Sequence, residues 1–173
     1  MDYYKNELRA LKRSGRLRQR KVVDEKLSDF ASNDYLGLAH NKDLHKKTSQ
    51  ELEKLPAHSA KASLLVNGYH QIHKDFEDAL CRANNFEDAV VVGSGFSANI
   101  AMIEALCRRG DILFMDELYH ASGILATQLD HVYVVFFKHN DLDDLTKLLQ
   151  KHKDAKRKVI AVEGIYSMDG DLC

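Results

Sequence analysis

The feature that most constrains the fold is a regular alternation of short apolar runs and helical segments after residue 88. Apolar runs occur at 89–92, 112–115, 132–137 and 159–162. Helical patterns separate them at 96–109, 121–129 and 141–152. Strands that alternate with helices and are apolar on both faces are typical of a parallel sheet with helices on both sides. We therefore expect an α/β fold.

The chain before residue 88 has a helical and irregular pattern instead. We expect helices at 2–20, 42–55 and 70–84, and a short strand at Leu27–Ala31. Further along, Gly110 is expected to end helix 96–109, and Asp141 to cap the helix that follows it. We divide the chain into an N-terminal helical and loop segment, residues 1–55, and a partial large domain, residues 56–173.

Composition excludes several classes of protein. A chain of 173 residues that is 45% hydrophobic and 29% charged is typical of a soluble globular protein. The net charge of −1 gives no reason to expect nucleic acid, and no run approaches the ~20 apolar residues of a membrane span. The cysteines form no C-x-x-C motif, so we expect a reducing cytoplasm, with Cys81 and Cys107 packed on helix faces.

Ligands of parallel α/β sheets bind beyond the carboxyl ends of the strands. The first apolar run is followed by Gly93-Ser94-Gly95, which opens a helix. Free amides and the positive dipole end of that helix predict a phosphate site, and a plain strand-to-helix turn is the simpler reading. The stretch Gly93-x-Gly95-x-x-Ala98, with Asp116 about 20 residues later, also fits an NAD(P)-binding Rossmann-like module. That fingerprint usually opens its domain, whereas here some ninety residues precede it.

Polar residues follow the other strands as well. His120 is expected at the start of a helix, facing the ligand cleft, where its ring can stack on a planar group. His139–Asp141 is read mainly as helix capping. The segment Glu163–Asp171 is rich in donors and acceptors, but its acidic residues lack the spacing of an EF-hand loop. We therefore predict no metal site from Glu163, Asp169 and Asp171.

Six segments in order resemble the α-oxoamine synthases, a family of pyridoxal 5'-phosphate (PLP) enzymes. They are Ser32–Leu38, Ala62–His73, Gly93–Asn99, Asp116–Ser122, His139–Asp141 and Tyr166–Asp171. The resemblance implies a fold-type I PLP-dependent transferase that acts as a homodimer on an amino acid and an acyl thioester. The likeness is greatest to members that condense L-alanine with a pimeloyl thioester, carried by CoA or acyl-carrier protein, in biotin synthesis. Members that use glycine or serine with an acyl-CoA remain an alternative.

The same resemblance implies roles for individual residues. The implied PLP-binding residues are Gly95, Phe96, His120, Glu163 and Ser167. Gly95 and Phe96 are expected to donate amides to the phosphate, His120 to stack on the pyridine ring as the catalytic residue, and Ser167 to bond near the phenolic oxygen. The implied substrate-binding residues are Arg18, Asn33 and His120. Arg18 lies in the basic run 12–21, which is otherwise read as a solvated helix end.

The chain also departs from the family pattern. The stretch His58–Leu64 has few glycines, and Leu64 stands where the family often has arginine. The Asp-x-x-His motif and the Ser/Thr-x-x-Lys motif that supplies the Schiff-base lysine are both absent from the sequence. The late lysines fall on a helix and its exit, on the wrong side of the next strand. We therefore expect this chain to be an inactive fragment of a working enzyme.

Overall fold

The computed structural model describes residues 2–24, 26–129 and 132–173. The chain divides into two compact units, Met1–Ala60 and Lys61–Cys173. The first contains α1 (Asp2–Arg13), the short 3-10 helix η1 (Leu38–His40) and α2 (Lys42–Glu53). The second contains the helical turn η2 (Leu64–Gly68), α3 (Gln71–Asn84), α4 (Gly95–Leu106), β1 (Ile112–Asp116), α5 (Ala121–Leu129), β2 (Tyr133–Phe137), α6 (Leu142–Lys151) and β3 (Lys158–Ala161).

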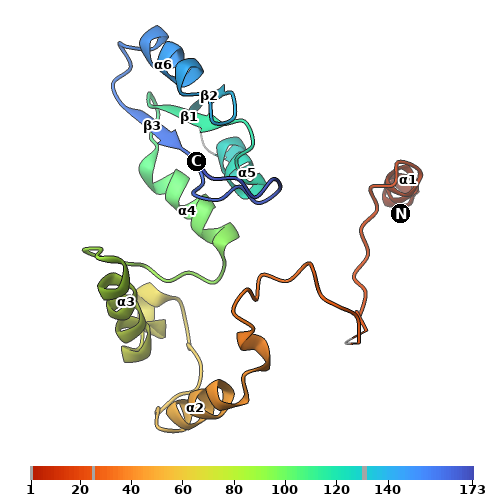
Figure 1. Cartoon of the computed structure of the whole chain (residues 1–173), viewed down its shortest axis with the longest axis vertical. Coiled ribbons are helices and arrows are strands. Elements are labelled where there is room, and N and C mark those ends of the chain that lie inside the picture. Colours follow the sequence, from red (N-terminus) through yellow and green to blue (C-terminus); the bar gives the residue numbers. More distant parts are fainter. Residues whose placement is uncertain (1, 25, 130–131) are drawn as a thin grey trace. The chain divides into compact units, whose positions relative to one another are not determined.

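A parallel sheet with the strand order β2-β1-β3 lies at the centre of the second unit (Figure 1). Ile112 of β1 is paired with Tyr133 of β2 and with Lys158 of β3. Every residue of β1 is buried, whereas β2 and β3 are partly exposed. The parallel α/β arrangement expected from the alternating pattern is therefore confirmed, and its apolar central strand is covered on both faces.

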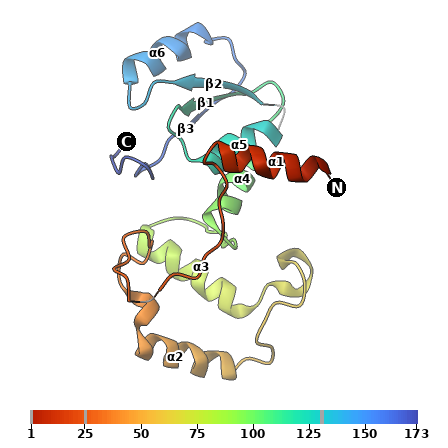
Figure 2. The same ribbon diagram turned by 90° about the vertical axis from the view of Figure 1, so that its right-hand side faces the viewer.

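Helices cover the two faces of this sheet, so the second unit has three layers at this point (Figure 2). On one face, α4 and α5 pack against β1 through a core of Ile103, Cys107, Leu113, Met115, Tyr119 and Ala126. On the other face, α6 packs through a core of Ile112, Phe114, Phe137 and Leu145. Alternate residues of β1 point to opposite faces and thus supply both cores. Cys107 packs in the first core and is 1% exposed, but it follows the last residue of α4 in an extended conformation, so the prediction that it lies on a helix face was wrong.

Helix α1 is shorter than the sequence pattern indicated. We expected a helix over 2–20, but α1 ends at Arg13. Gly15 adopts the left-handed conformation with φ of 68°, and the Arg16 amide donates to the Leu11 carbonyl at 2.9 Å. This is the geometry with which glycine terminates a helix. Arg18 consequently lies beyond the helix, in a stretch without regular secondary structure.

Two expected strands are absent from the described residues. The segment Leu27–Ala31 forms bends without a strand, and 89–92 has no strand partner. The amide of Val91 donates to Glu77 Oε1 at 2.9 Å instead of to a neighbouring strand, and Val90 is 76% exposed. An apolar run becomes a strand only where another strand accepts its hydrogen bonds, so these two predictions were wrong for the described chain.

The remaining helices agree with the predicted positions to within a few residues. The helix at 121–129 has the bounds expected, and the side chain of Asp141 caps α6 by accepting from the Asp144 amide at 2.8 Å. Gly110 does not end α4, because that helix stops at Leu106, where the next residue is extended. Gly110 occupies a later turn with φ of 95°.

Candidate cofactor-binding site

The start of α4 presents two open amides. Ser94 caps this helix, because its hydroxyl accepts from the Ser97 amide at 3.1 Å and its carbonyl accepts from the Ala98 amide at 3.0 Å. Within the described residues, the amides of Gly95 and Phe96 have no acceptor. No heavy atom lies within 4 Å of the position that a Cβ would take at Gly95. The helix therefore begins with two unpaired donors beside open space, which suits a phosphate group.

His120 is held by a network that joins α4 to α5. The Asn99 Nδ2 donates to Ser122 Oγ at 2.8 Å, and the Tyr119 hydroxyl donates to Asn99 Oδ1 at 3.1 Å. Ser122 Oγ lies 2.7 Å from His120 Nδ1, and the Ser122 amide donates to the same nitrogen at 3.2 Å. Because Nδ1 accepts, the ring proton belongs on Nε2. The imidazole is thus fixed through Nδ1, while the residue itself is exposed.

Glu163 connects this network to the segment that follows β3. Its Oε1 accepts the amide of His120 at 2.8 Å. Burial, followed by the charge of Glu163, raises the pKa of Tyr119. The structure therefore brings His120 and Glu163 together. Asn99, one turn after Gly95 and Phe96 in α4, connects this pair to α4 through its bond to Ser122. Asn99 and Ser122 were in the motifs that suggested the family, but their positioning role was not predicted.

Asp116 is the centre of a second polar cluster. Its carboxylate is fully buried and accepts the amides of Leu118 at 2.8 Å and Asn140 at 3.1 Å. The Nδ1 of His139 lies 2.9 Å from Asp116 Oδ1, and its Nε2 lies 2.7 Å from Asp171 Oδ2. Our reading of His139 and Asn140 as capping residues was therefore wrong. Burial acts to raise the pKa of Asp116, but these hydrogen bonds outweigh it and lower that pKa.

This cluster also bears on the dinucleotide alternative. A ribose-binding acidic residue must present a free carboxylate beyond the end of its strand. Both oxygens of Asp116 already accept hydrogen bonds within the protein, and the side chain is 0% exposed. Asp116 is therefore unsuited to hold a ribose hydroxyl. Of the two features that suggested an NAD(P)-binding module, only the glycine-rich stretch remains.

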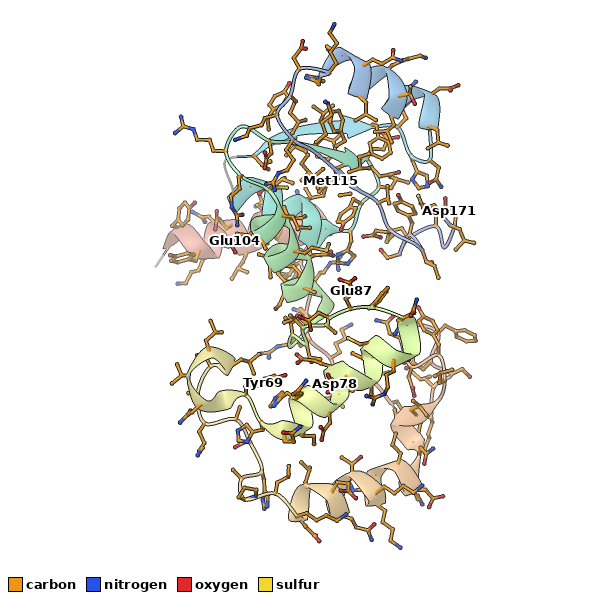
Figure 3. All side chains as sticks on the ribbon, turned by 90° about the vertical axis from the view of Figure 1, so that its left-hand side faces the viewer. Tyr69, Asp78, Glu87, Glu104, Met115 and Asp171 are labelled. Carbon is orange, nitrogen blue, oxygen red and sulfur yellow. The ribbon has the colours of Figure 1, made fainter. Side chains whose placement is uncertain are left out.

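Ser167 lies in a turn after β3. The amide of Tyr166 donates to the Asp171 carbonyl at 3.0 Å, the amide of Gly170 donates to the Tyr166 carbonyl at 2.9 Å, and Ile165 bridges Leu172. Figure 3 shows Asp171 in this C-terminal segment and Met115 within the sheet. The turn projects Ser167 into solvent, where its hydroxyl is available to a ligand.

The two remaining predicted residues belong to the first unit. Arg18 is exposed, and Asn33 Oδ1 accepts from the Tyr35 hydroxyl at 3.4 Å. Asp34 shapes the same loop, because its carboxylate accepts the amides of Leu38 and Ala39. Their roles toward a substrate stay predictions. In the described parts of the chain, no three His, Cys, Asp or Glu residues are grouped to bind a metal, and no helix is long and apolar enough to cross a membrane.

Comparisons with known proteins fit this arrangement. The model of the family described as aminotransferase class I and II matches residues 25–173. The chain belongs to this family. The 8-amino-7-oxononanoate synthase of Helicobacter pylori is 46% identical over 169 residues, which are 98% of this chain and 45% of that relative. The predicted likeness to PLP-dependent α-oxoamine synthases is confirmed.

Solved structures give the same result for the fold. A serine palmitoyltransferase of S. paucimobilis with a bound PLP-myriocin aldimine aligns over 99% of this chain and 46% of its own, with 26% identity and a TM-score of 0.83. The Sphingomonas wittichii serine palmitoyltransferase aligns over 80% of this chain and 35% of its own, with 34% identity and a TM-score of 0.75. The fold is that of a fold-type I PLP transferase, and the family cofactor is PLP. The chain spans about 45% of the length of the curated relatives it matches.

Proposed function

We propose that this chain provides the phosphate-binding and ring-facing residues of a PLP enzyme that condenses L-alanine with a pimeloyl thioester to form 8-amino-7-oxononanoate. The observation that carries the proposal is the pair of amides at Gly95 and Phe96 that have no acceptor among the described residues. They lie one turn before Asn99, whose side chain bonds Ser122, and Ser122 in turn bonds His120 Nδ1. The 46% identity to a relative named for this product favours the reaction. PLP supplies an electron sink when bound.

The described residues have distinct tasks in this proposal. Gly95 and Phe96 bind the phosphate with backbone amides, which are strong donors when the acceptor is charged. His120 presents its ring to the planar cofactor, and Ser122 together with Asn99 keeps that ring from rotating. Glu163 holds the His120 backbone against the exit of β3. Ser167 supplies a hydroxyl near the phenolic oxygen, and Arg18 and Asn33 contact the substrate.

Further parts of the proposal concern the whole protein. Residues 1–55 are the N-terminal segment, and 56–173 are part of the PLP-binding large domain. The enzyme acts as a cytoplasmic homodimer, without nucleic acid or a membrane as partner. By itself this chain has no turnover, since its sequence lacks a Ser/Thr-x-x-Lys motif. Formation of product from L-alanine and pimeloyl-CoA by the isolated chain would contradict that point.

Gly95→Pro and Gly95→Ala form a matched pair that tests the phosphate contact. Proline is tolerated at the first position of a helix, and Ser94 already has the extended conformation that proline requires of the preceding residue. Gly95→Pro thus removes one amide donor while the helix stays intact. Gly95→Ala keeps the amide and adds a methyl group that meets nothing within 4 Å.

A hydrogen bond to a charged group is worth about 1.5–3 kcal/mol. Gly95→Pro should therefore raise the Kd for PLP roughly 10- to 150-fold. The measurement is fluorescence titration with PLP and with pyridoxal, which lacks the phosphate. We expect Gly95→Pro to remove most of the advantage of PLP over pyridoxal, and Gly95→Ala to keep it. Equal PLP affinity in the two variants, or equal affinity of the unaltered protein for PLP and pyridoxal, rules the contact out.

The second candidate is an α-oxoamine synthase that uses serine or glycine. The 34% identity to the Sphingomonas wittichii serine palmitoyltransferase supports it. Titration of L-alanine, L-serine and glycine into the PLP-loaded protein, followed through the absorbance of PLP, separates the candidates. A spectral response to L-alanine at the lowest concentration supports the biotin reaction, and a stronger response to serine or glycine refutes it.

A further inference from the structure

His139 lies between two carboxylates, and this position determines its protonation state. Its Nδ1 is 2.9 Å from Asp116 Oδ1, and its Nε2 is 2.7 Å from Asp171 Oδ2. An ionised carboxylate only accepts hydrogen bonds, so each ring nitrogen has to donate. A neutral imidazole has one N–H, whereas the imidazolium has two. The geometry is therefore that of a cationic His139, and its side chain is 19% exposed.

One end of this bridge is a rigid anchor. Asp116 is the last residue of β1, the central and fully buried strand of the sheet. Its carboxylate also accepts the amides of Leu118 and Asn140. A carboxylate that is fixed by two backbone donors cannot follow a moving partner. His139 is therefore attached to the sheet itself.

The other end of the bridge is the turn after β3. Asp171 closes that turn, because its carbonyl accepts the Tyr166 amide at 3.0 Å. The neighbouring Asn140 Nδ2 adds bonds to Asp171 Oδ2 and to the Leu172 carbonyl, each of 3.0 Å. The ring of His139 also meets the buried ring of Tyr166 edge-on, with centroids 4.4 Å apart. Together with the bond from His139 to Asp171, these contacts connect the ends of β1 and β2 to the segment 166–172.

We infer that His139, as an imidazolium bridging Asp116 and Asp171, is a positioning residue that fixes the turn carrying Ser167 at the end of the sheet. The inference rests on the proposed function in one respect, namely that Ser167 contacts PLP. His139 itself acts through Asp171 and Tyr166 and need not touch the cofactor. Its place two residues beyond β2 allows it to reach residues from two other segments of the chain.

The charges around His139 all favour its cationic form. Asp116 and Asp171 bond to its ring, and Glu117 Oε1 accepts its backbone amide at 3.1 Å. Asp116, then Asp171, raise the pKa of His139 above its ordinary value, against a smaller opposing effect of burial. A histidine with a raised folded-state pKa stabilises the folded form fully below its unfolded pKa of about 6.5. That contribution is lost as the pH rises through the folded-state pKa, so the bridge weakens in alkaline solution.

Hydrogen exchange measured by mass spectrometry tests the inference without PLP. The exchange of the imidazole C2 proton gives the titration midpoint of His139, and amide exchange reports the bonds donated by Tyr166 and Gly170. The variants are His139→Gln and Asp171→Asn, and the control is His45→Gln, because His45 is exposed on α2. We expect a midpoint above about 6.5 in the unaltered protein. The two amides should exchange about tenfold faster in His139→Gln, since a charge-assisted bond is lost.

The pH series separates positioning from general stability. In the unaltered protein, protection of the two amides should fall as the pH passes the midpoint of His139, after correction for intrinsic exchange. Asp171→Asn should lower that midpoint, and His45→Gln should leave it unchanged. The inference fails if His139 titrates at or below its ordinary value, or if His139→Gln keeps full protection at pH 6. If His139→Gln also loses protection in β1, it has unfolded, and the pH series with Asp171→Asn decides. If the unaltered protein binds no PLP while these exchange results hold, the proposed function is refuted and the inference about the His139 bridge still stands.

Discussion

Gly123 packs so closely against Tyr119 that one added methyl group should lower the stability of the protein. A Cβ at Gly123 would lie 2.1 Å from Tyr119 Cε1 and 2.3 Å from Cδ1. The ring cannot easily swing away, because it is 6% exposed and its hydroxyl is bonded to Asn99. We therefore predict that Gly123→Ala destabilises the protein, although alanine is the better helix former.

The magnitude follows from three contributions. Overpacking in a core costs about 1–3 kcal/mol. Loss of the hydrogen bond from Tyr119 to Asn99 adds about 1 kcal/mol, and the higher helix propensity of alanine offsets about 1 kcal/mol. The net loss in the free energy of unfolding is therefore about 1–3 kcal/mol.

Equilibrium unfolding in urea, followed by circular dichroism, measures this loss. Gly164→Ala is the control, because a Cβ there meets nothing within 4 Å. In a Tyr119→Leu background, Gly123→Ala should cost much less, since the clashing ring atoms are gone, and the double-mutant cycle gives the coupling. The reasoning is refuted if Gly123→Ala stabilises the protein by about 1 kcal/mol, the value of helix propensity alone.

Two further predictions concern ionisable groups. Arg157→Gln removes the guanidinium that donates to Asp111 Oδ2 and holds the pKa of Asp111 below its ordinary value. The variant should be less stable than the unaltered protein at neutral pH. This difference in stability should shrink as the pH falls below about 4, through the folded-state pKa of Asp111. Urea midpoints that differ equally at pH 7 and pH 3 contradict this prediction. Tyr166→Phe removes a buried hydroxyl whose pKa is raised to about 12 by burial and then by the carboxylate of Asp116, although the geometry of that contact is too poor for it to count as a hydrogen bond among the described residues. The unfolding free energy should stay the same or rise by about 1–2 kcal/mol, and a loss above about 1 kcal/mol in urea unfolding indicates a bond to that hydroxyl.

The sequence predicted best those elements that local pattern controls. The apolar run of β1 and the helix 121–129 were placed within a residue of their observed bounds. The end of α1 was missed, although Gly15 offered the signal, because the basic run beyond it continued a helical composition. The run 89–92 was misassigned because an apolar composition says nothing about whether a neighbouring strand is present.

The parts of the site differ in the same way. Gly95 and Phe96 follow an obvious glycine-rich turn, so their open amides could be expected from sequence. The bridge at His139 depends on the register that places Asp116 beside Phe137, and on a turn more than thirty residues further on. No local pattern contains that information. The usable signal was an acidic residue that ends one strand and a histidine soon after the next.

The buried carboxylate of Asp116 has a consequence for the assignment of function from sequence motifs. A search for a glycine-rich turn followed by an acidic residue at the end of the next strand selects this chain, although that acid faces inward and its oxygens are engaged by Leu118, His139 and Asn140. In this chain the His139-Asn140 pair just after the following strand engages that acid and makes it structural. A match to the dinucleotide fingerprint therefore identifies a ribose-binding acid only where the carboxylate is also free of partners inside the protein.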